Sequence, residues 1–288
     1  MSGRRAQASR NASLLGLSGS LLMILQSAFM LVGGAVALYA LSFAVRGDLT
    51  TALEVAGTAA VLVGITLLFD LVGLTFLSTA FWLHAKTARV GPAFAPAPDP
   101  ERRSLAFQGL LAAVFLLLWL LVTLAWRGAL AAIVSFYPSP FGTDLGGIAS
   151  DDLRRAAGVM LGLWVVAAFL LFLGAVFGTR FLQRARGVPV SFWRLLWPAE
   201  TLLHFGTAVA ILAVAPGLLA RRLQVEIGTL RVIETLGVLD LLVVPILGLL
   251  AYGFLFREFW ALFRRAPALG ASPPAPAPSP TDPPGGGT

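Results

Sequence analysis

Long apolar segments, separated by short polar stretches, dominate the pattern of this chain. The first runs from 14 to 45 and has 32 residues without a charged side chain, whereas a bilayer core needs about 20 residues of helix. Five comparable segments follow, and proline, glycine and capping residues mark the breaks between them. The pattern predicts an all-α, multi-pass integral membrane protein with transmembrane helices over residues 14–45, 52–86, 105–136, 151–186, 198–222 and 230–265.

The second, fourth and sixth of these helices end in similar sequences, in which phenylalanine is followed by basic residues. The three endings are Phe81 to Arg89, Phe181 to Arg186 and Phe259 to Arg265. They predict three helical hairpins whose basic ends lie on one side of the membrane. The matching details are consistent with an internal repeat, but capping and charge rules alone produce much of the likeness.

The distribution of charge predicts the orientation. With the three basic endings and the N-terminal segment on one side, that side carries 14 of the 21 lysine and arginine residues. The positive-inside rule assigns this side to the cytoplasm. Both termini are therefore predicted to be cytoplasmic, in the plasma membrane, and anionic lipid headgroups are the expected partners of the basic surface.

Composition supports one membrane domain over 13–266, between a cytoplasmic segment 1–12 and a tail 267–288. The chain is 58% hydrophobic and 12% charged, against about 45–50% and about 25% in soluble domains. The Pro/Ala/Gly-rich tail is predicted to be disordered. A cleaved signal peptide is the alternative for the first segment, with Ala35-Val36-Ala37 as its cleavage site, but the apolar run is longer than such peptides have. The net charge of +7 is explained by topology, so no nucleic-acid partner is predicted.

Three local signals refine the helix ends. Thr51 with Glu54 three residues later forms a capping box and predicts the start of the second helix there. Pro198 suits the first turn of the fifth helix, because proline lacks the N–H that this position leaves unpaired. Pro245 predicts a bend in the sixth helix.

Few polar residues interrupt the apolar segments. Asp70 lies near the middle of the second helix, and intramembrane acids are functional candidates. Asp240, a third of the way into the sixth helix, is a second candidate. A structural role as a hydrogen-bonded link between helices is the alternative for Asp70, with Gln26 as its partner.

Glu200 and His204 are four residues apart, and so share a face of the fifth helix. His84 and Glu258 lie at a matching depth on other helices. If the helices converge, the four residues predict a proton relay or a divalent metal site. The alternative, favoured because the chain has only two histidines, places His84 and Glu258 in the headgroup region, with Glu258 paired to an arginine. No metal or cofactor is therefore predicted.

Glycine pairs in the fourth helix predict close helix packing. The pairs are Gly158 with Gly162 and Gly174 with Gly178. Because 16 residues separate them, they face directions about 160° apart on an ideal helix, which favours two different neighbours within the bundle. A homo-oligomer through one pair is the alternative.

No catalytic, P-loop or dinucleotide motif occurs, and the chain has no cysteine, so an enzyme is not predicted. Two functions remain. The favoured one, because the loops are short and few polar residues lie in the apolar segments, is a non-enzymatic accessory or scaffold subunit that acts through helix, lipid and membrane-protein contacts. The second is a small transporter or channel-like protein that uses Asp70, with Asp240, on its path. A dry, packed Asp70 favours the first function, and a wet cavity that reaches Asp70 favours the second.

Overall fold

The computed structural model is helical almost throughout. It describes residues 2–87, 89–90, 95–96, 99–136, 150–189, 191–220 and 235–265. The predicted turn at 137–147, the connection at 221–228 and the tail at 267–288 lie outside these residues. Six helices of the described part are long and apolar enough to cross a membrane, which confirms the prediction of an all-helical membrane protein with six candidate spans.

The described residues form helices and two short strands. The helices are α1 (Ser2–Val45), α2 (Leu49–Thr87), α3 (Asp99–Phe136), α4 (Ser150–Arg186), α5 (Phe192–Ala220), the π-helical segment η2 (Leu239–Val243) and α7 (Val244–Arg265). Residues 235–238 are helical and lead into η2. Two short strands, β1 (Arg89–Val90) and β2 (Ala95–Pro96), pair antiparallel between α2 and α3.

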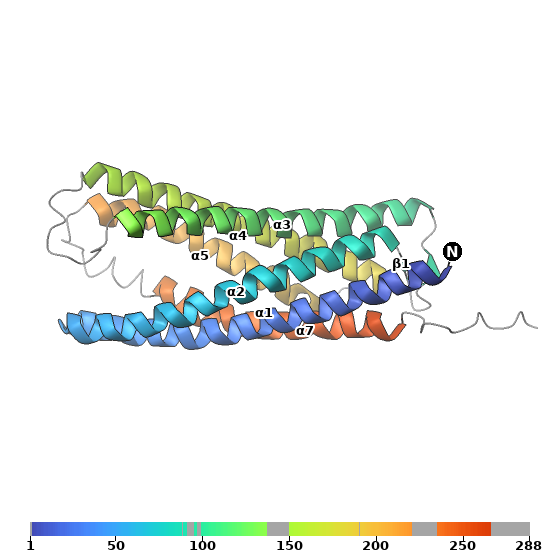
Figure 1. The fold of residues 1–288 in the computed structure, drawn as a ribbon, viewed down its shortest axis with the longest axis horizontal. Coiled ribbons are helices and arrows are strands. Elements are labelled where there is room, and N and C mark those ends of the chain that lie inside the picture. The colour runs from blue at the N-terminus through green and yellow to red at the C-terminus, as the bar shows by residue number, and fades with distance from the viewer. Residues whose placement is uncertain are drawn as a thin grey trace, which may run out of the picture.

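The helices form a closed ring. Figure 1 shows them side by side along the long axis of the molecule, with the N-terminus, β1 and the red C-terminal end of α7 at one end. Each helix packs on the next in chain order, and α7 packs on α1 to complete the ring. The axes of packed helices lie about 8–10 Å apart. Six helices arranged in a ring at this spacing enclose a central space, whereas two or three packed helices do not. The centre must therefore be filled by side chains or remain a cavity.

Small residues let α1 approach its neighbours. Ser13, Ser20, Ser27 and Gly34 recur at intervals of seven residues, and the three serines are at most 2% exposed. A β-carbon at Gly34 would lie 2.5 Å from the Leu241 carbonyl oxygen of η2. A seven-residue stripe of small residues is the pattern that allows close contact between membrane helices.

Four helices begin several residues earlier than predicted, among them α1 at Ser2 and α3 at Asp99. α2 begins at Leu49, and the Thr51 amide donates a 3.1 Å hydrogen bond to Asp48 Oδ1, so Asp48 rather than Thr51 is the cap. Hydrogen bonds from the Thr51 hydroxyl and amide lower the pKa of the exposed Asp48 carboxyl. α5 begins at Phe192, which places Pro198 inside the helix and not in its first turn.

Pro245 is preceded by a wide helical turn. The Val244 amide donates to the Leu239 carbonyl, five residues back. Proline has no N–H, and its ring clashes with the carbonyl four residues earlier in a regular helix, which here belongs to Leu241. The π-turn relieves this clash and contains the buried Asp240. Such π-turns occur frequently at functional sites.

Candidate functional site

A cavity of about 630 Å³ lies inside the helix ring. Its volume is within the range of about 300–1,000 Å³ that is common for small-molecule sites. Every spanning helix contributes to its wall. The polar lining consists of Gln26, Ser27, Thr66, Asp70, Thr123, Glu200, His204, Asp240 and Tyr252, and the tryptophans are Trp119, Trp126 and Trp164.

His204 and Asp240 form the central ion pair of this cavity. His204 Nδ1 lies 2.8 Å from Asp240 Oδ1, and the Thr207 hydroxyl donates to the same oxygen at 2.8 Å. The His204 ring also meets Trp164 edge-on, with 5.7 Å between ring centroids. A charge-assisted hydrogen bond of this length fixes both partners. α5 and the π-turn are thus joined at the cavity wall.

Glu200 lies one turn before His204 and is only 6% exposed. Its Oε2 atom accepts no hydrogen bond within the part of the chain that the structure describes. Its carboxylate interacts electrostatically with His204, Asp240 and Asp70. A buried carboxylate without a donor is strongly unfavourable unless it binds a proton or a cation. Glu200 is therefore the residue of the wall that most requires a ligand.

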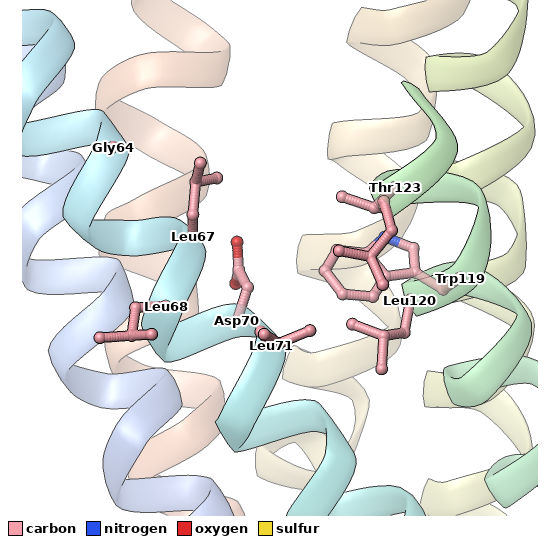
Figure 2. Close-up of a pocket in the computed structure, with 9 residues that line it drawn as sticks. Gly64, Leu67, Leu68, Asp70, Leu71, Trp119, Leu120 and Thr123 are labelled. Carbon is pink, nitrogen blue, oxygen red and sulfur yellow. The ribbon is translucent and has the colours of Figure 1, made fainter. Parts of the chain in front are cut away.

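Asp70 lies on α2 and is 9% exposed. It lines the central cavity and also a groove between α2 and α3. Figure 2 shows its carboxylate pointing into the space between these helices, opposite Trp119 and Thr123. Gln26, the predicted partner, lines the same cavity, and its Oε1 accepts a hydrogen bond from Ser27 at 3.1 Å.

The other two members of the predicted relay lie outside the cavity lining. His84 Nε2 is 3.2 Å from Ser13 Oγ, and its ring stacks on Phe259 at 6.1 Å. Glu258 Oε1 accepts a 2.6 Å hydrogen bond from Arg186 Nη1. The structure therefore does not bring the four predicted residues together: Glu200 and His204 meet Asp70 and Asp240 instead. Over the described residues, no group of three histidine or acidic side chains has a geometry that would hold a metal ion.

The two glycine pairs of α4 differ in their surroundings. A β-carbon at Gly174 would meet Leu116 of α3 at 2.9 Å, and one at Gly178 would meet Trp197 of α5 at 2.7 Å. No described atom lies within 4 Å of a β-carbon at Gly158 or Gly162. Close packing on α4 is therefore limited, within the described structure, to the Gly174 and Gly178 pair.

Several residues in or beside the cavity wall were not identified from the sequence. Thr207 follows Glu200 and His204 at the spacing of one helix face, and this signal identifies it in retrospect. The tryptophans of α3 and α4 carry no such signal, because an aromatic residue in an apolar segment is equally suited to lipid, core or cavity. A comparison of the chain with protein-family models, curated proteins and solved structures found no match.

Chemical labelling can establish whether the cavity is wet. Ser27 lines the cavity, and because the chain has no cysteine, the variant Ser27→Cys carries a single thiol. We expect a water-soluble cationic methanethiosulfonate to label it in detergent, since thiolates form only where water or charge supports them. Ser20→Cys is the matched control: Ser20 is fully buried one heptad earlier on α1, outside the cavity lining. Equal labelling of the two variants would contradict a wet cavity.

Proposed function

We propose that this protein is a small membrane transporter or channel-like protein in which Asp70, Glu200, His204 and Asp240 line the path. The observation that carries the proposal is the cavity in the helix ring, on which three carboxylates and a histidine converge. Acidic residues and histidine within membrane helices are typical of ion pathways and proton relays. A packed scaffold protein has no need of a cavity of this size with three carboxylates in its wall.

The proposed mechanism is competition between a proton and a cation for the same carboxylates. Asp240 is already engaged by His204 and Thr207, so it acts as a fixed anchor. Glu200 has a free oxygen, and we assign to it the alternating binding of proton and cation. Asp70 lines both the cavity and the α2–α3 groove. We assign to it the first contact with a proton or cation that enters the cavity and the last contact with one that leaves.

The proposal includes the orientation expected from the charges. Three hairpins would place both termini and all three basic helix ends at the cytoplasmic side of the plasma membrane. The common position of the N-terminus, β1 and the end of α7 in Figure 1 supports this arrangement. The excess of lysine and arginine at these ends supplies the charge bias.

The experiment is proton flux in proteoliposomes that carry a potassium diffusion potential and a trapped pH dye. We expect the wild-type protein to acidify the vesicles faster than protein-free controls. Asp70→Asn should reduce the flux to the protein-free level, because it removes the titratable group without changing the size of the side chain. Glu54→Gln, at an exposed position on α2, is the matched control and should behave as the wild type.

An unchanged flux in Asp70→Asn would contradict the transporter proposal. The second candidate, an accessory or scaffold subunit, would then be favoured. One observation supports that candidate: Gly158 and Gly162 have no described atom within 4 Å of a β-carbon, and glycine pairs of this spacing can contact another membrane helix or a second copy.

A further inference from the structure

A groove between α2 and α3 lies beside the central cavity and shares part of its wall. It has a volume of about 300 Å³. It shares Asp70, Trp119 and Thr123 with the central cavity. Figure 2 shows these side chains between the two helices, with Asp70 at the junction. A molecule in the groove would therefore reach the Asp70 carboxylate without passing through either end of the bundle.

The outer rim of the groove consists of exposed leucines. Leu68 of α2 is 61% exposed and Leu124 of α3 is 47% exposed, and both line the groove. Exposed apolar side chains in the middle of membrane-spanning helices face acyl chains. The groove thus opens sideways, to the lipid and not to water, so a molecule that uses it must partition into the bilayer.

The cavity behind the groove favours positive charge. Among the residues that the structure describes, its lining contains three carboxylates and no lysine or arginine, and its one histidine is held by Asp240. Glu200 Oε2, which has no hydrogen-bond partner among these residues, adds an acceptor. Three tryptophans complete the wall, and their faces attract organic cations by cation–π interaction. An apolar anion or a neutral lipid would offer no positive charge to the buried Glu200 carboxylate.

We propose that the cavity binds a lipophilic organic cation, such as an amphipathic amine, which reaches it from the bilayer through the α2–α3 groove. The inference rests on the cavity of the proposed function and names its substrate class. The inference concerns only what the cavity binds, so it can be correct or wrong independently of the proposed transport. The alternatives, an acyl chain of a lipid or a proton alone, are outcomes of the tests below.

Two ions of equal size and opposite charge test the binding class. Tetraphenylphosphonium and tetraphenylborate would be titrated into the purified protein in detergent, with equilibrium dialysis as the readout and tryptophan fluorescence as a second one. We expect saturable binding of the phosphonium only. Glu200→Gln should weaken it by about tenfold or more, a loss of about 1.4 kcal/mol, whereas Glu54→Gln should leave it unchanged.

Equal binding of both ions would overturn the inference in favour of an acyl-chain site, and binding of neither would favour a proton alone. The wild-type comparison needs no variant, so it stays decisive if Glu200→Gln fails to fold. Phosphonium binding without any proton flux would refute the proposed transport and leave the binding class intact.

A tryptophan in the groove tests the route. Leu124→Trp narrows the groove, whereas Leu121→Trp changes a leucine on the same helix that is 54% exposed and outside the groove lining. In lipid nanodiscs, we expect Leu124→Trp to slow both association and dissociation of the phosphonium by a similar factor, with little change in Kd. Leu121→Trp should match the wild type. Identical rates in the two variants would overturn the lateral route.

Discussion

Replacing Glu258 with alanine is expected to lower the free energy of unfolding by about 3–5 kcal/mol, the usual cost of leaving a buried charge unpaired. The Glu258 side chain is 2% exposed and its Oε1 atom lies 2.6 Å from Arg186 and 3.7 Å from Arg194. Arg194 also donates to the Pro189 carbonyl at 2.5 Å. Glu258 therefore links α7, through charged contacts, to the C-terminal end of α4 and the N-terminal end of α5. Its loss would leave the guanidinium groups of Arg186 and Arg194 without this counter-charge.

Unfolding in mixed micelles or thermal melting in detergent would measure this effect. Glu54→Ala is the control, because a change at an exposed position usually alters stability by no more than about 0.5 kcal/mol. The double variant Glu258→Met with Arg186→Met should recover part of the loss, since apolar replacement of a whole buried pair is often tolerated. A Glu258→Ala protein as stable as the control would refute the assigned role of this ion pair.

Replacing Asp240 with alanine is expected to have the largest effect at the cavity. His204 and Thr207 would both lose the oxygen that now accepts their hydrogen bonds. The Thr207 hydroxyl keeps the His204 carbonyl as an acceptor at 2.9 Å, whereas His204 Nδ1 is left unsatisfied, so a loss of about 1–3 kcal/mol is expected. Proton flux should fall to the protein-free level, because His204 loses its anchor.

The matched variant Asp240→Asn separates charge from hydrogen bonding. Its amide oxygen can still accept a bond from Thr207, so we expect a smaller loss of stability together with the same loss of flux. Thr207→Val, which removes one hydrogen bond and no charge, should cost about 1 kcal/mol. The anchor role is refuted if Asp240→Asn transports protons as fast as the wild type.

The internal repeat and the cytoplasmic orientation stay predictions. They follow from three similar helix endings and from a charge count, and one mechanism, the positive-inside bias, produces both patterns. The placement of the N-terminus, β1 and the end of α7 at one end of the bundle agrees with them (Figure 1). A reporter fused after Thr288 would test the orientation.

Sequence reasoning identified the individual polar residues but not the group that they form. It considered a relay of His84, Glu258, Glu200 and His204, all predicted at a similar depth, and favoured the alternative in which Glu258 pairs with an arginine. Depth along a helix is readable from position in an apolar segment, but the direction in which a side chain points around the helix axis is not. The structure pairs Glu258 with Arg186 and His84 with Ser13, and places Asp240 beside His204.

The sequence by itself determined the solvent, the number of candidate spans and the C-terminal ends of most of the described helices. These properties follow from the free energy of transferring each segment from water to lipid. That free energy is a sum over the residues of the segment and does not depend on the neighbouring helices. The tertiary structure alone decided that the helices close into a ring, that α1 approaches η2 at Gly34, and that a cavity remains between them. Ring closure depends on how six helices rotate and pack on one another, and no single segment contains that information. Asp70 was a candidate from its sequence position, and its place at the junction of groove and cavity came only from α3 lying opposite α2.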